Sequence, residues 1–262
     1  MIGTEFGGGT REVEVRVLIL NPNTSEVFTS AIQMAADKYK APGTQVTAMN
    51  PASGPRSIES VYDQLLSCQP CLEVFINCAR DYDGFVVACF GDHPVIQAAR
   101  EITSKPVLGM FEASLYTACM LGYRFSVVNT GDRARDPRLW DALRRYGVAH
   151  RCASDRPTGM TVLDLESAGE SSVRQRITDE ARRAVEEDGA DVIILGCAGM
   201  VGLDKEVQSK VGVPVVDGVA AALKLIEALI GYGVETSKAG AYSLPEAKEL
   251  LNLAPVFRKP YA

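Results

Sequence analysis

Two stretches of the sequence repeat one plan of secondary structure. Residues 84–110 read GFVVACFGDHPVIQAAREITSKPVLGM, and residues 190–218 read ADVIILGCAGMVGLDKEVQSKVGVPVVDG. In each, an apolar run rich in β-branched residues leads to a cysteine, a turn of small residues, a helix and a short strand after KPV or VPV. The repeat predicts two similar lobes, with one cysteine at the end of a strand in each.

The rest of the chain alternates in the same way, which predicts an α/β fold with largely parallel sheets. We expect two pseudo-symmetric lobes, each a mainly parallel sheet flanked by helices. Because parallel strands present ligands at their carboxyl ends, the active site is expected in the cleft between the lobes. Strands are predicted at residues 15–20, 45–49, 84–89, 106–110, 124–129, 191–196 and 214–217, and helices at 25–40, 58–80, 94–103, 113–121, 135–146, 171–188 and 219–231.

Composition excludes several classes of protein. A net charge of −6 over 262 residues, without a basic patch, argues against a nucleic-acid partner. No apolar run is long enough to span a membrane, and the N-terminus lacks the apolar core of a signal peptide. Residues 1–14 are interpreted as a disordered lead or cloning remnant. The seven cysteines are an odd number and several lie in apolar elements, so we expect reduced thiols in a cytoplasmic protein.

The cysteines of the repeat, Cys89 and Cys197, are open to two interpretations. Free cysteine is a common core residue. Both, however, precede glycine-containing turns at expected helix starts, where the helix dipole favours a thiolate and would bring the thiol pKa closer to neutrality. The amides of these turns would also stabilise an oxyanion. A thiolate and a thiol facing each other suit proton transfer at the two faces of one carbon.

Other motifs have structural and functional interpretations. Asn21, in the turn NPNTS after the first expected strand, lies where its amide could bind a polar ligand. His93, four residues after Cys89, could form a Cys-His nucleophile, although GDHP also reads as a helix entry. Cys68, Cys71 and the two distant histidines do not make a four-ligand zinc site, so no metal is expected.

Seven separated segments together resemble the hydantoin racemases of the aspartate/glutamate racemase superfamily, a family that includes allantoin racemases. The resemblance runs from about Val15 to Tyr242. The segments are LNPNTS, PASGPRSIES, VVACFGD, FSVVNT, EDGADVIILGCAGMVG, VPVVDGVAAALKLIEALI and ETSKAGAY, in that order.

The resemblance implies one lobe of residues 15–118 with 217–262, and a second of residues 119–216. It implies cofactor-independent racemisation by Cys89 and Cys197, and a homo-oligomer. Relatives read CFGDP, whereas this chain has His93 between Asp92 and Pro94. The segment GDRARDPRLW also departs from the family. The resemblance therefore does not identify the side chain of the substrate. The implied substrate contacts are Asn21, Ser53, Gly54, Phe90, Gly91, Asp92, Thr130, Ala198, Gly199 and Met200.

The predicted function is therefore racemisation of 5-monosubstituted hydantoins by two cysteine bases, without cofactor. A turn set of Phe90, Gly91, Ala198 and Gly199 suits a neutral cyclic imide better than a free amino acid. Racemisation of allantoin is an alternative within the family. Alternatives outside it are a hydrolase that uses Cys89 and His93, and a non-catalytic small-molecule binder.

Overall fold

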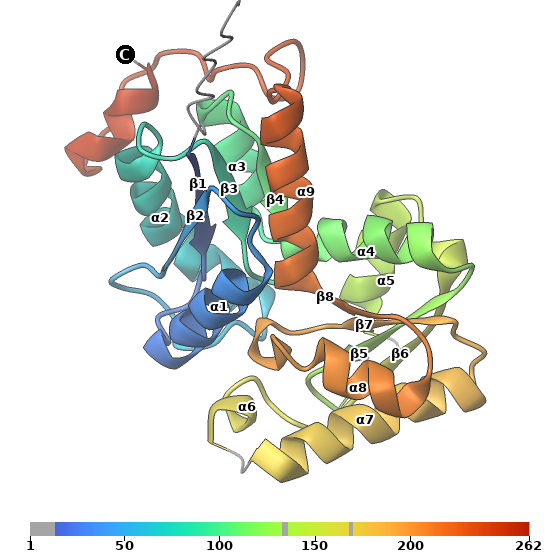
Figure 1. Ribbon diagram of the computed structural model, residues 1–262. Coiled ribbons are helices and arrows are strands. Elements are labelled where there is room, and N and C mark those ends of the chain that lie inside the picture. The colour runs from blue at the N-terminus through green and yellow to red at the C-terminus, as the bar shows by residue number, and fades with distance from the viewer. Residues whose placement is uncertain (1–13, 133–135, 168–169, 262) are drawn as a thin grey trace, which may run out of the picture.

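The computed structural model describes residues 14–132, 136–167 and 170–261, and it consists of two lobes, each built on a four-stranded parallel sheet (Figure 1). The first sheet has the order β2-β1-β3-β4, and the second has the order β6-β5-β7-β8. The predicted α/β class with two lobes is confirmed. The strands are β1 (Val15–Leu20), β2 (Thr44–Met49), β3 (Gly84–Val87), β4 (Val107–Gly109), β5 (Phe125–Asn129), β6 (Cys152–Pro157), β7 (Val192–Leu195) and β8 (Val215–Asp217).

Helices cover both faces of each sheet, which buries the apolar strands on two sides. On the first sheet, α1 (Glu26–Tyr39) and α9 (Gly218–Tyr232) pack on one face, and α2 (Val61–Cys78) and α3 (Val95–Ile102) pack on the other. On the second, α4 (Met110–Leu121) and α5 (Pro137–Arg145) oppose α7 (Glu170–Glu186) and α8 (Asp204–Val211). The short elements are α6 (Asp164–Ser167) and the 3-10 helices η1 (Ala149–Arg151), η2 (Ala198–Met200) and η3 (Pro255–Tyr261).

The two sheets correspond strand by strand. Leu20 of β1 pairs with Val87 of β3, and Val128 of β5 pairs with Leu195 of β7. One residue further, the N–H of Ala88 donates to Leu20 at 2.8 Å, and the N–H of Gly196 donates to Val128 at 2.8 Å. Cys89 and Cys197 are the next residues, so they occupy the same position in the two lobes.

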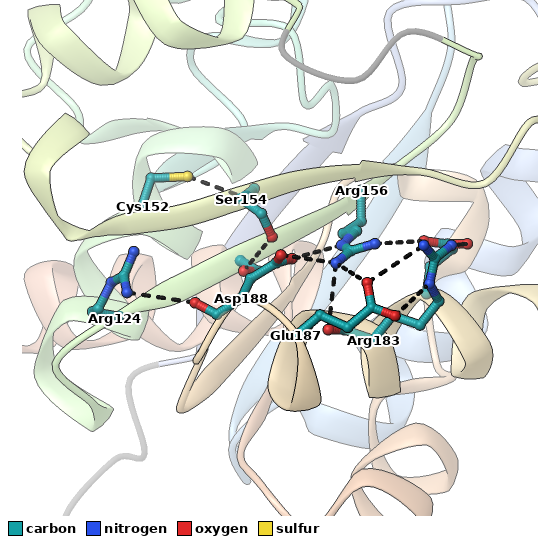
Figure 2. Close-up of polar contacts among 9 residues, drawn as sticks. Arg124, Cys152, Ser154, Arg156, Arg183, Glu187 and Asp188 are labelled. Atoms are coloured by element: carbon teal, nitrogen blue, oxygen red, sulfur yellow. Dashed lines mark hydrogen bonds and ion pairs between the residues drawn. The ribbon is translucent and has the colours of Figure 1, made fainter.

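Strand β6 was not predicted, because its sequence CASDRP lacks an apolar run. The strand lies at one edge of its sheet, and ion pairs connect it to the residues that follow α7. Arg156 donates to Asp188 at 2.6 Å and to Glu187 at 2.7 Å (Figure 2). Desolvation of Arg156, which has 13% of its side chain exposed, is offset by these partners.

The chain passes from the first sheet to the second through α4 and returns from β8 into α9 (Figure 1). The lobe boundaries at residues 118 and 217 remain a proposed division. Beyond α9, residues 234–254 run along the first lobe, and η3 packs against α2. The predicted N-terminal lead lies almost wholly outside the described residues. Within the described ranges, no helix combines the length and apolarity that a membrane span requires.

Candidate active site

The first turn of the site follows β3 and contains Cys89, Phe90, Gly91 and Asp92. Gly91 lies close to the Cys89 sulfur, and its N–H lowers the pKa of that thiol. The Gly91 carbonyl accepts a hydrogen bond of 2.6 Å from Nε2 of Gln64 on α2. Asp92 has a φ of 47°, which is costly for a residue with a side chain. The turn is therefore held in an unfavourable backbone conformation by contacts from outside it.

The second turn follows β7 and has the same relation between cysteine and glycine. The Gly199 N–H donates to the Cys197 sulfur at 3.4 Å. Here the turn closes on itself as η2, because the Met200 N–H donates to the Cys197 carbonyl at 3.0 Å. In both turns, the N–H of the glycine two residues further along lowers the pKa of the cysteine.

The two turns meet at the junction of the lobes. Ala198 packs against the core of the first lobe, although it belongs to the second sheet's turn. Phe90 packs against core residues of both lobes, with its ring 4.9 Å from that of Phe111 and perpendicular to it. The charge of a Cys89 thiolate would raise the pKa of Cys197, so the thiols are near enough to interact electrostatically.

The expectation that a helix start brings the thiol pKa toward neutrality is wrong. Burial raises the pKa of Cys89 to about 11 and that of Cys197 to about 12, and the glycine N–H bonds only partly oppose this. Helix α3 begins at Val95, six residues beyond Cys89, and Cys197 precedes only one 3-10 turn. Neither thiol therefore lies at the end of an α-helix dipole.

Asn21 is placed differently from the prediction. Its side chain is fully buried, and its Nδ2 donates to Asn23 and Thr29 at 3.0 Å each and to the Ser25 carbonyl at 3.2 Å. The carboxamide thus shapes the turn and is not presented to a ligand. The corresponding residue of the second lobe is Asn129, which the prediction omitted. Comparison of the ends of β1 and β5 would have found it.

The other residues predicted to contact the substrate differ in whether a ligand could reach their side chains. Met200 is fully buried in the second lobe's core, so its side chain cannot reach a ligand, which corrects that prediction. Ser53 and Gly54 lie on an exposed loop, with Gly54 near Thr24 of the turn that follows β1. Thr130 is half-buried, and its N–H donates to the Asn129 side chain at 2.9 Å.

His93 is buried and both of its ring nitrogens are occupied. Its Nδ1 accepts from the Val95 N–H at 3.2 Å, so Nε2 carries the proton and bonds to Ser67 at 2.8 Å. Burial lowers the pKa of His93 to about 4. A neutral, doubly bonded imidazole is not available as the base of a Cys-His nucleophile, which argues against the hydrolase alternative.

Side chains from each lobe contact the other around the two turns, and the sequence did not predict them. Tyr39 of α1 donates to both carboxylate oxygens of Asp204 of α8, at 2.7 and 2.9 Å. Further contacts join Ser25 and Arg56 to Glu166, Arg138 to the Glu59 carbonyl, and Asp92 to Arg145 and Tyr146. Partners so distant in sequence give no local signal. Together they hold the lobes against each other at the site.

The described residues contain no group of three or more His, Cys, Asp or Glu side chains that could hold a metal ion. All seven cysteines are free thiols.

Two equivalent parallel sheets, each ending in a cysteine at the junction, define a two-lobed α/β protein built from a repeated half. The Asp/Glu/hydantoin racemase family model matches residues 17–226, and the chain belongs to this family of isomerases. The hydantoin racemase of Pseudomonas sp. strain NS671 is 42% identical over 236 residues, 90% of this chain and 94% of that protein.

Solved structures are similar over nearly the whole chain. The allantoin racemase from Klebsiella pneumoniae is 38% identical, covers 94% of this chain and 98% of its own, and superposes with a TM-score of 0.87. The allantoin racemase from Pseudomonas fluorescens is 36% identical, with a TM-score of 0.86 over 91% of this chain and 100% of its own.

Proposed function

We propose that the protein racemises 5-monosubstituted hydantoins without a cofactor, by proton transfer between C5 of the ring and two cysteines. One observation carries the proposal. Cys89 and Cys197 follow equivalent strands of the two lobes, each has beside it the N–H of the glycine two residues further along, and the charge of a Cys89 thiolate would raise the pKa of Cys197. This arrangement supplies a base and an acid on opposite sides of one carbon.

In one direction, the Cys89 thiolate takes the C5 proton and the electron pair delocalises into the adjacent ring carbonyl. The Cys197 thiol then gives its proton to the other face of C5. The turnover leaves Cys89 protonated and Cys197 as the thiolate, which is the form that acts on the opposite enantiomer. No net proton is gained or lost, so the reaction requires no cofactor.

The raised thiol pKa values are compatible with this reaction. Burial that disfavours a thiolate also makes it a stronger base once formed, and removing a proton from carbon needs a strong base. The Gly91 and Gly199 amides stabilise the thiolate at the moment when the other sulfur is protonated. They act on sulfur, in place of the oxyanion role that the sequence predicted for these amides.

Allantoin is the second candidate substrate. It contains the same ring, and the allantoin racemases cited above are 36 to 38% identical to this chain. The ring chemistry would be unchanged, and the substituent at C5 would be a polar ureido group. Phe90 and Ala198, which directly follow the two cysteines, are apolar and partly buried, so we place hydantoins with apolar substituents first.

The test uses single enantiomers of benzylhydantoin, methylthioethylhydantoin and allantoin, with optical rotation as the readout and a no-enzyme control at each pH. We expect loss of rotation with at least one of them. Cys89→Ser and Cys197→Ser should each lower kcat by more than about 1,000-fold, because each removes one of the two proton carriers. Cys78→Ser, at the far end of α2, is the matched control and should retain activity. A folded wild type that is inactive on all three substrates contradicts the proposal.

We also propose a homo-oligomer located in the cytoplasm. The N-terminal half of α2 exposes Val61, Tyr62, Leu65 and Leu66, each at least 49% accessible, and this apolar surface would suit a second copy of the chain. Light scattering on a size-exclusion column measures the mass directly. A monomer at micromolar concentration would contradict the oligomer.

A further inference from the structure

We propose that Tyr146 is a positioning residue for Cys89: through Asp92, it holds the turn whose Gly91 N–H contacts the thiol. A side chain of the second lobe would thereby set the geometry of a thiol in the first lobe. The inference deepens the proposed function and rests on it for its effect on racemisation.

The first step is the hold on Asp92. Its Oδ1 accepts from the Tyr146 hydroxyl at 2.7 Å, and its Oδ2 pairs with Arg145 at 2.6 Å. Asp92 has a φ of 47°, a left-handed backbone conformation that costs most residues with a side chain roughly 1–2 kcal/mol and Asp less. The contacts with α5 offset that cost and keep the turn in this conformation.

The second step is the rigidity of Tyr146. It follows the last turn of α5, where its N–H donates to the Ala142 carbonyl at 3.0 Å. Its ring packs edge-on against Phe111 at 5.6 Å and against Tyr116 at 6.2 Å. Arg145 has 63% of its side chain exposed, and ion pairs in water contribute little. Tyr146 is therefore the stronger of the two partners of Asp92.

The third step connects Asp92 to the thiol. Gly91 lies between Phe90 and Asp92. Its N–H lowers the pKa of Cys89, and its carbonyl accepts from Gln64. If Asp92 relaxes to a negative φ, the peptide that joins Gly91 to Asp92 turns, the Gly91 carbonyl loses Gln64, and the freed Gly91 can carry its N–H away from the sulfur. The Cys89 thiolate would then lose the one hydrogen bond that opposes its desolvation.

The turn of Cys197 provides an internal reference. It is closed by the Met200 and Val201 N–H groups, which donate to Cys197 and Ala198 at 3.0 and 3.2 Å. Loss of the Tyr146 hydroxyl should therefore affect Cys89 and leave Cys197 unchanged.

The test is Tyr146→Phe, which removes the hydroxyl and keeps the ring and the charge of Asp92. Keeping that charge matters, because Asp92 itself raises the pKa of Cys89, and Asp92→Asn would change two effects of opposite sign. The other titratable groups that face Cys89 are Cys71 of α2 and Cys197. These two groups are the same in the wild type and in Tyr146→Phe.

Both thiols are followed in one sample by pulsed alkylation with iodoacetamide from pH 7 to 10 and mass spectrometry of the two peptides. In this range the alkylation rate is proportional to the thiolate fraction, so a shift of a thiol's midpoint is measured as a change of its rate at fixed pH. For Tyr146→Phe we expect the Cys89 midpoint to rise by about half to one pH unit relative to Cys197. Racemisation at pH 8 should fall by about three- to tenfold, since the thiolate fraction falls tenfold per unit. Arg145→Gln should shift the midpoint in the same direction by less.

Tyr116→Phe is the matched control. It removes a tyrosine hydroxyl beside the same ring, from a side chain that is 46% exposed, and should change neither thiol. The inference is overturned if the Cys89 midpoint of Tyr146→Phe equals that of the wild type, or if both thiols shift equally. A Cys89 shift in Tyr146→Phe, together with a wild type that has no racemase activity, would support the inference and contradict the proposed function. Racemisation by the wild type, with no Cys89 shift in Tyr146→Phe, would support the proposed function and overturn the inference.

Discussion

The two cysteine turns share one register and place a glycine N–H beside the sulfur, but they differ in the contacts that hold them. The Cys197 turn is stabilised by its own backbone as η2. The Cys89 turn contains a non-glycine residue at positive φ and depends on Gln64 from α2 and on Tyr146 from the other lobe. The two halves therefore place the thiol at the same position but stabilise that position by different contacts.

The largest expected effect concerns pH and compares the two thiols directly. Burial raises the pKa of Cys89 to about 11 and that of Cys197 to about 12, so the catalytic form with one thiolate becomes populated as pH rises. We expect kcat/KM to rise about tenfold per unit, roughly 100-fold from pH 7 to pH 9. A pH–rate profile with a buffer-only control measures this, and a profile flat across that range would contradict it.

The next effect compares the two glycines. A Cβ at Gly199 would lie 2.8 Å from Leu165 and 3.0 Å from Phe28, whereas one at Gly91 would lie 2.5 Å from the flexible end of Gln64. Gly91→Ala should lower kcat on the order of tens of fold, because its Cβ displaces Gln64 from the Gly91 carbonyl, and Gly199→Ala by less, because the backbone bonds that close its turn remain. Gly231→Ala, where space is open, is the control. Equal losses would show that the two turns are equally rigid.

A third effect concerns stability in the second lobe. Burial raises the pKa of Asp155 to about 6, and its Oδ1 has no hydrogen-bond partner. The native state therefore retains a proton that the unfolded state releases, so the free energy of unfolding should fall by roughly 2–3 kcal/mol as pH rises from about 4 to 7. Urea unfolding of Asp155→Asn should show this loss removed, with the exposed Asp141→Asn as control. A wild-type loss that persists in Asp155→Asn would contradict this assignment.

The smallest expected effect concerns the contact between the lobes. Tyr39→Phe removes both hydrogen bonds to Asp204, which is 3% exposed, and should lower the free energy of unfolding by about 1 kcal/mol. Tyr232→Phe, at 81% exposure, should leave it unchanged. Urea unfolding followed by fluorescence compares the two variants. Equal stability of Tyr39→Phe and wild type would show that this contact adds nothing.

The sequence predicted what local pattern can encode. Runs such as VRVLIL and DVIILG are apolar enough to identify buried parallel strands, and their repetition located both cysteines. The strand CASDRP escaped detection because it lacks an apolar run, and the contact of its Arg156 with the distant Asp188 has no local signal. Asn21 looked available because its buried partners, such as Thr29, are recognisable only after the turn has folded. The tie between Asp92 and Tyr146 spans 54 positions and has no local signal.

The central claim is that two thiols act on opposite faces of one carbon, and deuterium labelling tests it most directly. A single enantiomer of benzylhydantoin is converted in D2O, and the reaction is stopped after a few per cent of turnover. The two enantiomers are then separated and the hydrogen at C5 is measured. The account predicts deuterium in the product enantiomer and protium in the recovered substrate, because one sulfur removes hydrogen and the other delivers it from solvent. Equal labelling of both enantiomers, or protium carried into the product, would contradict it.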